Sequence, residues 1–387
     1  MHIRYHNFVL VSTKIHKFDI GSKKESLFSY TYKEYCVFPN IIQASVFYYD
    51  RITLVLHISY DRLDPSLIDQ VTNWDAPISL AVVFPKNIFI MHSEIACSAQ
   101  KLLNYTKNNQ KVKKHLSVHF LLGNNTGCDN SKVFYDSFDF LNKDYCSSTN
   151  RTTPTNEKSR IQRISQYPVN VARNVARKNS RTKYILIADM DHFFSENFEL
   201  QIRNMASKLL EREPKTVLVY RIFEVSSKVK RYPKTKQELY KLYKTSEAQE
   251  FHKPYGGHSI PKLNEWFKRP EVSNETSIQF YRKYDNYQWE PQFVSLTSIP
   301  FHDESFFYPF RDNTVLRWEM CRMSYKFAII NDVFMYHRGI KSKNEKSFLQ
   351  KLRQTSSKQG NIAIKKFNER MDKHFLDTKK KCPKFRA

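Results

Sequence analysis

The sequence predicts an α/β fold with a mostly parallel central sheet and helices on both of its faces. Apolar, strand-like segments alternate with amphipathic, helix-like segments, which is the pattern of consecutive βα units. The 387 residues are enough to bury a large core. Only 7 residues are glycine and 14% are aromatic, so the composition is that of a folded globular protein.

The first half of the chain provides three predicted strands and one helix. The helix begins near Asp64-Pro65, because proline suits the first turn of a helix. The strands are short apolar runs, typical of buried strands: ITLVLHISY (52–60), ISLAVVF (78–84) and LSVHFLL (116–122). The segment 123–160 is rich in Asn, Ser, Thr and Asp and predicts a surface loop.

A second series of elements follows. A helix is predicted over 167–179, where Pro168 lies near the start and four apolar residues share one side: Val171, Ala172, Val175 and Ala176. Strands are predicted at 184–188, 216–220 and 327–336. From residue 346 onward the chain is basic and has a helical period, which predicts a terminal helix.

The charge of the chain favours anionic partners. Lys and Arg number 63 against 38 Asp and Glu, which gives a net charge of +25. Basic residues concentrate at 228–244 and from 341 to the C-terminus, and a solvated basic face is the alternative interpretation of each cluster. The chain contains no recognisable nucleic-acid-binding motif, so we predict no nucleic-acid partner.

The glycosylation motifs favour a secretory-pathway protein, with chance occurrence in a chain rich in Ser, Thr and Asn as the alternative. The six cysteines show no CxxC spacing, which argues against a zinc site. Four tripeptides fit the N-glycosylation pattern, at Asn104, Asn124, Asn150 and Asn274. No window approaches the roughly 20 apolar residues that span a bilayer, so any anchor is not visible in this chain.

Two carboxylates follow the predicted strand at 184–188. Asp189 and Asp191 are separated by one residue and point to the same side of an extended chain. In open α/β sheets, ligands bind at the carboxyl ends of the strands. Two carboxylates aimed at one point repel each other, so a divalent metal that also binds nucleotide phosphates is the natural partner. A turn with two solvated acids is the alternative.

This block of sequence resembles glycosyltransferase family 49, which contains the LARGE-type xylosyl- and glucuronyltransferases and the β-1,4-glucuronyltransferase. Five segments resemble the family in the same order, over roughly residues 50–375. They are SYDRLDPSLIDQVTNWDAPISLAVVF (59–84), QYPVNVARNVARKNSRTKYILIADMDHFFSENFE (166–199), FEVSSKVKRYPKTKQELYKL (223–242), WEPQFV (289–294) and HDESFFYPFRDNTVLRWEMCRMSYKFAIINDVFMYHRGIK (302–341).

The resemblance implies a GT-A type domain over 50–378. It is preceded by an N-terminal segment, 1–49, without a clear anchor and followed by a basic tail, 379–387. The implied activity is inverting transfer of a sugar, with glucuronic acid favoured, from a UDP donor to a glycan on a glycoprotein in the Golgi lumen. N-acetylglucosamine or xylose as the donor sugar, and an inactive glycan-binding relative, remain alternatives.

The resemblance also assigns donor-site residues. Asp189, Asp191 and His337 would hold the metal, which we expect to be Mn2+. His337 can reach that metal only if the strand at 327–336 ends beside the strand at 184–188. Residues expected to approach the donor nucleotide or its sugar are Asp61, Arg62, Arg173, Asn174 and Lys341, with Arg338 able to neutralise diphosphate charge.

The catalytic base is left open among several carboxylates. Inverting transfer needs a carboxylate that accepts the proton of the acceptor hydroxyl. Asp303 and Asp312 are ranked together, followed by Glu304, and Glu319 matches a further acid of the family. Any of them could instead form ion pairs with the abundant Lys and Arg.

The chain departs from the family pattern on the acceptor side. A family glycine of the closing block is replaced near Phe310, and HSIPKLNEW (258–266) keeps His258 and Trp266 but has Lys262 where asparagine is expected. The identity of the acceptor is therefore open.

Overall fold

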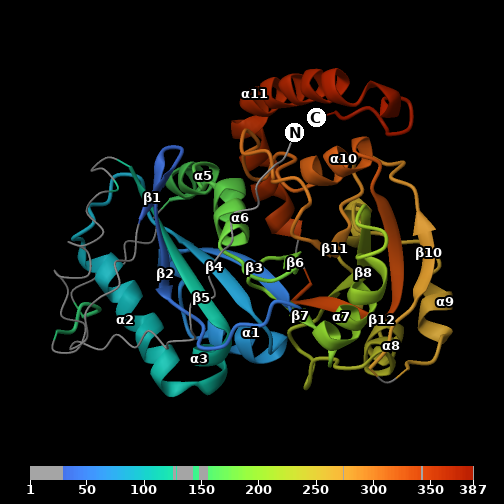
Figure 1. Ribbon diagram of the computed structural model, residues 1–387, viewed down its shortest axis with the longest axis horizontal. Helices are drawn as coiled ribbons and strands as arrows, with labels where there is room; N and C mark the ends of the chain where they lie inside the picture. The colour runs from blue at the N-terminus through green and yellow to red at the C-terminus, as the bar shows by residue number, and fades with distance from the viewer. Residues whose placement is uncertain are drawn as a thin grey trace, which may run out of the picture.

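The computed structural model describes residues 29–386, except for 125–127, 129–142, 148–155, 273 and 341–342. The predicted α/β class is confirmed: one twelve-stranded sheet runs through the molecule with helices packed on it (Figure 1). The strand order is β1-β2-β5-β4-β3-β6-β11-β8-β12-β10, with β7 beside β12 and β9 beside β8.

The described strands have the following bounds. They are β1 (Tyr30–Tyr32), β2 (Tyr35–Ile42), β3 (Ile52–Ser59), β4 (Ile78–Val83), β5 (Leu116–Gly123), β6 (Tyr184–Ile187), β7 (His192–Phe194), β8 (Thr216–Val225), β9 (Ala248–Glu250), β10 (Ile278–Arg282), β11 (Gln292–Leu296) and β12 (Lys326–Arg338). All the strands predicted from apolar runs are present.

The sheet is mixed, and the expected parallel pairing is confined to part of it. Strands β5, β4, β3 and β6 are parallel neighbours, as are β8 and β12. Strand β11 is antiparallel to both β6 and β8 and joins these two parallel parts. Strands β1, β2 and β10 also pair antiparallel, and β1 and β10 lie at the two ends of the strand order.

Helices cover the sheet where the periodicity predicted them, and further helices lie between. The α-helices are α1 (Ser66–Trp74), α2 (Ser93–Asn108), α3 (Gln110–His115), α5 (Glu157–Ser165), α6 (Val169–Lys178), α7 (Phe198–Leu209), α8 (Lys236–Lys244), α9 (Leu263–Lys268), α10 (Thr314–Arg322) and α11 (Lys343–His374). Short 3-10 helices are η1 (Tyr60–Arg62), η3 (Lys253–Tyr255) and η4 (Leu376–Thr378). Among the described helices, none is both long and apolar enough to cross a bilayer.

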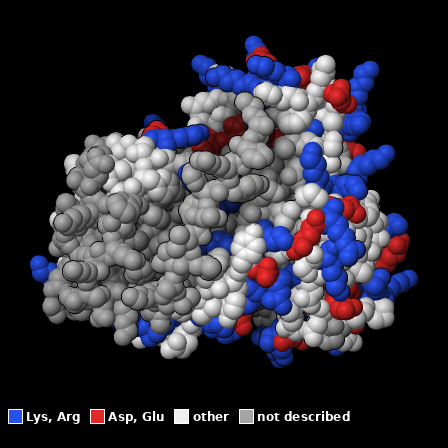
Figure 2. Space-filling view, viewed as in Figure 1, with Lys and Arg blue, Asp and Glu red and all other residues white. Residues whose placement is uncertain are grey.

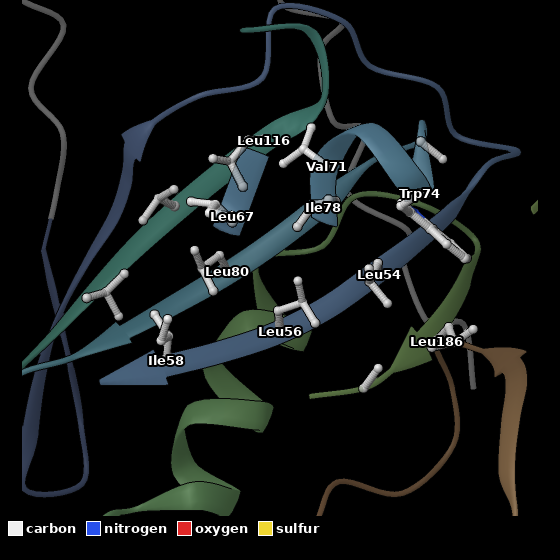
Figure 3. Packing of buried hydrophobic residues seen from close by; sticks show 14 of the residues in the cluster. Leu54, Leu56, Ile58, Leu67, Val71, Trp74, Ile78, Leu80, Leu116 and Leu186 are labelled. Carbon is white, nitrogen blue, oxygen red and sulfur yellow. The ribbon is translucent and has the colours of Figure 1, made fainter. Parts of the chain in front are cut away.

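The two faces of the sheet bury two separate apolar clusters. Side chains alternate along a strand, so Leu54 and Leu56 of β3 point to one face and Val55 points to the other. Helix α1 covers the first face, where its side chains lie over those of β3 and β4 (Figure 3). The helix contributes Leu67, Val71 and Trp74, and the two strands contribute Leu54, Leu56, Ile58, Ile78 and Leu80. Helix α6 covers the second face through Ala172 and Val175. This packing fixes the carboxyl ends of β3 and β6 side by side.

Three disulfides tie outlying segments to this core. They join Cys36 to Cys128, Cys97 to Cys146 and Cys321 to Cys382. Residues 30–42, assigned from sequence to an N-terminal segment, form two strands of the sheet. The end of the chain is also packed, since Phe385 is buried. Both segments therefore belong structurally to the domain.

Strand β12 pairs with β8 at both of its ends, but its other neighbour changes midway from β10 to β7. This change directs the last residues of β12 to the site. Its register to β8 shifts between Ile329 and Phe334. Asp332 in this bulge has a positive φ of 72° and forms a buried ion pair with Lys236 of α8, with Nζ and Oδ1 3.3 Å apart. Beyond the bulge, β12 pairs with β7. The bulge thus places His337 next to the chain that follows Asp189 and Asp191.

Candidate active site

Asp189 and Asp191 lie at the carboxyl end of β6, as predicted. Strand β3 is the parallel neighbour of β6, and His57 on β3 lies close to the first carboxylate: its Nε2 is 3.5 Å from Asp189 Oδ1. The Nη2 atom of Arg173, on α6, is 3.6 Å from the same oxygen. Half of the Asp189 side chain and 61% of the Asp191 side chain remain exposed to solvent. Both acids are therefore held by the fold and accessible to a ligand.

Two histidines complete the cluster. His192, the first residue of β7, lies opposite His337 of β12 in the antiparallel pair. Ligand atoms of Asp189, Asp191 and His192 lie within 4.8 Å of one another. His337 was expected to reach the site beside β6, and this route is wrong, because β12 pairs with β8, β10 and β7. It reaches Asp191 instead through the pairing of β12 with β7.

The hydrogen bonds of His337 leave a lone pair facing Asp191. Its Nδ1–H donates to the carbonyl oxygen of Gly339 at 3.0 Å, because a carbonyl oxygen can only accept. The Nε2 atom then faces Asp191 Oδ2 at 3.0 Å. Two acceptors this close repel each other unless a proton or a metal ion lies between them. The donor set of carboxylates and imidazole therefore fits a divalent metal such as Mn2+.

His192 has the opposite polarity. The backbone N–H of Asp189 donates to His192 Nδ1 at 3.3 Å, so the proton of the neutral ring is on Nε2. That Nε2 lies 3.9 Å from Asp189 Oδ2 and 3.8 Å from Asp191 Oδ1. His192 therefore lies beside both carboxylates without a hydrogen bond to either, whereas His337 offers Asp191 a neighbouring ligand atom.

The surroundings keep both carboxylates ionised. Burial alone would raise the pKa of Asp189, but the nearby His57 and His192 rings and the positive charge of Arg173 hold this pKa well below its usual range. Burial also opposes ionisation of Asp191, and the nearby His337 and His192 rings lower its pKa. The site presents two negative charges to a cation at neutral pH.

Arg173 connects this cluster to one of the predicted catalytic carboxylates. Its guanidinium pairs with Asp312 Oδ2 at 2.9 Å while also facing Asp189. Asn170 on the same side of α6 donates to the carbonyl oxygen of Asp312 at 3.0 Å. Asp312 is buried, which raises its pKa against the lowering effect of Arg173. The predicted residues Arg173 and Asp312 are thus brought to the site.

Other predicted residues have different partners. Arg370 of α11 forms ion pairs with two of these acids. Its Nη2 is 3.0 Å from Asp303 Oδ2, and its Nη1 is 2.7 Å from Glu319 Oε1. Glu304 accepts hydrogen bonds from Tyr32 and Asn174 and pairs with Lys33: the Tyr32 and Asn174 contacts are both 2.7 Å. The Asn174 amide is further used by the backbone of His302. These side chains join α6 and α11 to the 302–304 segment, and no described hydrogen bond or ion pair links them to Asp189 or Asp191.

The predicted nucleotide-binding residues lie at the same sheet edge. Asp61 and Arg62 form η1 directly after β3, where Asp61 pairs with Arg163 and Arg62 is exposed. Arg338 pairs with Asp69 at 3.3 Å and stacks over Phe193 at 3.7 Å. Lys341 lies outside the described residues.

Three residues near the site were missed in the sequence. His57 and His192 are isolated histidines whose role appears only when β3, β6 and β7 come together. Glu290 lies in the quoted segment WEPQFV, and its charge acts on Arg173 and raises the pKa of Asp312. Its carboxylate accepts a hydrogen bond from Asn313. In the sequence, Glu290 is distinguished only as a carboxylate within one of the segments that resemble the family.

Comparison with known proteins establishes the family. A family model described as "Glycosyl-transferase for dystroglycan" matches residues 51–376. The chain therefore belongs to glycosyltransferase family 49, as its motifs predict, and it has the α/β fold that this membership implies.

Individual relatives match over part of their length. β-1,4-Glucuronyltransferase 1 of Danio rerio is 27% identical over 220 residues, which are 56% of this chain and 49% of that protein. Xylosyl- and glucuronyltransferase LARGE1 of Gallus gallus is 24% identical over 333 residues, 84% of this chain and 36% of that protein. The chain thus spans half or less of the length of these curated relatives.

Solved structures overlap more loosely. The match to GalNAc-T7 with UDP, GalNAc and Mn2+ has a TM-score of 0.40 at 10% identity. It covers 84% of this chain and 56% of the GalNAc-T7 chain. S. aureus TarS 1–349 with UDP-GlcNAc has a TM-score of 0.34 at 12% identity, covering 77% of this chain and 61% of its own.

Proposed function

We propose that this protein is a metal-dependent, inverting glycosyltransferase that moves a sugar from a UDP donor to a glycan on a glycoprotein. The observation that carries this proposal is the cluster after β6, where ligand atoms of Asp189, Asp191 and His192 lie within 4.8 Å of one another. His337 adds to this cluster, because its Nε2 lies 3.0 Å from Asp191 Oδ2. A cation is needed there, and a nucleotide diphosphate is the ligand that such a cation holds at the end of a β-strand.

The metal would be held by Asp189, Asp191 and His337, with Mn2+ the best match to carboxylates and imidazole. When bound, it offsets the charge of the diphosphate as the bond to the sugar breaks. His192 lies beside the two carboxylates, with its Nε2 3.9 Å from Asp189 Oδ2 and 3.8 Å from Asp191 Oδ1. Asp61 and Arg62, at the neighbouring strand end, lie where the nucleoside would be contacted.

Asp312 is the carboxylate best placed to act as general base. Its link to Asp189 through Arg173 sets it beside the metal site, whereas Asp303 and Glu304 are held by Arg370, Asn174 and Tyr32. Asp312 accepts the proton of the acceptor hydroxyl as that oxygen forms a bond to the anomeric carbon. The bond from that carbon to UDP breaks, and UDP leaves with the electron pair.

Glucuronic acid is the favoured donor sugar, because both relatives described above are named for glucuronyl transfer. N-acetylglucosamine or xylose transfer, and binding of glycan without catalysis, are the alternatives. A screen of UDP-sugars with purified protein tests the proposal. We expect UDP release that depends on Mn2+, is lost with EDTA, and is fastest with UDP-glucuronic acid. Release from no donor in the presence of Mn2+ would favour the inactive glycan-binding relative.

The disulfides and glycosylation motifs support a location in the secretory pathway, with the Golgi lumen as the proposed site. Disulfides form in oxidising compartments, and Asn104 and Asn274 are exposed. We expect protein made in animal cells to migrate faster on a gel after peptide-N-glycosidase treatment. Asn104→Gln and Asn274→Gln should each remove part of that shift. Unchanged migration together with cytosolic fractionation would contradict this location.

A further inference from the structure

Tyr167 and His57 form a contact between helix α6 and strand β3 beside Asp189. Tyr167 lies two residues before α6, where its backbone N–H donates to the carbonyl oxygen of Ile164 at 3.1 Å. His57 points to the face of the sheet that α6 covers, because it lies two residues after Val55 on β3. The Tyr167 hydroxyl is 2.9 Å from His57 Nδ1, and the centroids of the two rings are 5.6 Å apart. The start of α6 is thus joined to the last residues of β3.

The surroundings of the two ring nitrogens assign the proton of neutral His57. Its Nε2 atom is buried, forms no described hydrogen bond and lies 3.5 Å from Asp189 Oδ1. A proton on Nδ1 would leave the lone pair of Nε2 facing that carboxylate oxygen, and two acceptors repel each other. The Tyr167 hydroxyl can donate or accept, and His57 Nδ1 is its only partner among the described hydrogen bonds. The favourable arrangement therefore has Tyr167 donating to Nδ1 and the His57 N–H on Nε2, directed at Asp189.

The two oxygens of Asp189 face different groups. Oδ1 lies 3.5 Å from His57 Nε2 and 3.6 Å from Arg173 Nη2. Oδ2 lies on the side of His192, whose Nε2 is 3.9 Å from it and 3.8 Å from Asp191 Oδ1. The contacts of Oδ1 are longer than a hydrogen bond of about 2.7 to 3.2 Å, and a small rotation of the half-exposed carboxylate would close them. Donors that hold Oδ1 leave Oδ2 available on the side of Asp191, where one cation can contact both acids.

This local alignment matters because the protein as a whole repels cations. Its net charge is +25, and Figure 2 shows Lys and Arg gathered along α11 and scattered over the rest of the described surface. A divalent cation therefore depends on the direction of the few carboxylate oxygens at its site. Removing a group that orients a ligand carboxylate typically weakens metal binding by about 10- to 100-fold.

We propose that Tyr167 is a positioning residue of the metal site. Its hydroxyl keeps the His57 proton on Nε2, and that N–H orients Asp189 so that Oδ2 is directed to the metal. The inference rests on the proposed metal-dependent function and deepens it, because it assigns a role to two residues that act through Asp189. Without the hydroxyl, the His57 proton is free to move to Nδ1, and the lone pair of Nε2 then repels Oδ1.

Tyr167→Phe tests the inference, because it removes the hydroxyl and keeps the ring. Titration calorimetry measures binding of Mn2+ alone to the full chain, so no turnover is required. We expect Tyr167→Phe to weaken Mn2+ binding about tenfold. Tyr30→Phe is the matched control and should bind as wild type does, since the Tyr30 hydroxyl accepts from Asn179 at the other end of α6, 3.0 Å away. Equal Mn2+ affinities of wild type and Tyr167→Phe would overturn the inference.

A second substitution separates positioning from a loss of packing. Glutamine at position 57 carries an amide N–H that cannot be lost to a tautomer, so His57→Gln should keep most of the Mn2+ affinity. Adding Tyr167→Phe to His57→Gln should weaken binding little further, because the hydroxyl has no tautomer left to select. If Tyr167 acted only through packing, its replacement would have the same effect with His57 or glutamine present. An equal loss in both backgrounds would therefore contradict the positioning role.

Nitrogen NMR of protein labelled in histidine reports the tautomer directly. The His57 signals are identified by their absence in His57→Gln, and in wild type we expect the proton on Nε2. A wild-type His57 with its proton on Nδ1 would overturn the inference. Failure of the proposed function is distinguishable. Wild-type protein that binds no Mn2+ would remove the metal site together with this role, whereas Mn2+ binding that does not depend on Tyr167 would remove this role alone.

Discussion

Replacing Asp312 by asparagine is expected to lower kcat for sugar transfer by about a hundredfold or more, the usual contribution of a general base. Asparagine has nearly the same shape and its amide oxygen can still accept the hydrogen bond from Arg173, now 2.9 Å from Asp312. The proton acceptor alone is lost. Binding of UDP and Mn2+ should change little, because Asp312 is not among the ligands proposed for the metal.

The controls for this variant are chosen among the competing carboxylates. Asp303→Asn and Glu290→Gln should each retain far more activity, since Asp303 is paired with Arg370 and Glu290 accepts from Asn313. Steady-state kinetics and UDP binding are measured on the same preparations. If Glu290→Gln loses the activity and Asp312→Asn retains it, the base is Glu290.

The same assignment predicts the direction of the pH dependence. Burial raises the pKa of Asp312, and Arg173 only partly offsets this. A base acts in its ionised form, so the rate should fall as pH decreases through this raised pKa, at a higher pH than for an ordinary aspartate.

The local parts of the fold and site were predictable from sequence. Strand β6 is an apolar run that ends at Asp189, so both the strand and the position of the acids at its carboxyl end follow from the chain itself. Helix α6 follows from the spacing of its apolar residues and from Pro168. The motif around His337 predicts a metal ligand, but it does not predict the strand pairing that brings His337 to Asp191.

The parts that depend on strand order were not predictable. A histidine such as His192 has no distinguishing sequence signal, and its role arises from the β7–β12 pairing across more than a hundred residues. The candidate bases Asp303 and Asp312 could not be ranked, because their partners Arg370 and Arg173 belong to different helices. Strand β11 enters antiparallel between β6 and β8, and no local pattern specifies that position.

Replacing Asp191 by asparagine is expected to abolish transfer while leaving the fold intact. The substitution removes one negative charge from the cluster of Asp189, Asp191 and His192, which His337 contacts through Asp191, and it adds no volume. The side chain is 61% exposed, so the metal-free variant should differ from wild type by no more than about 0.5 kcal/mol in free energy of unfolding. Affinity for Mn2+, and for UDP in its presence, should fall sharply.

Thermal unfolding with and without ligand separates these effects. Mn2+ and UDP together should raise the Tm of the wild-type protein, because a ligand that binds only the folded state stabilises it. The same additions should leave the Tm of Asp191→Asn nearly unchanged. Asp75→Asn is the matched control, since that side chain is 54% exposed, pairs with Lys111 at the end of α1 and should keep the full response. A carboxylate that holds the cation cannot be neutralised without weakening both the binding of Mn2+ and the transfer of sugar. If Asp191→Asn retains the ligand-induced rise in Tm and transfers sugar at a rate unaffected by EDTA, Asp189 and Asp191 are therefore not a metal site.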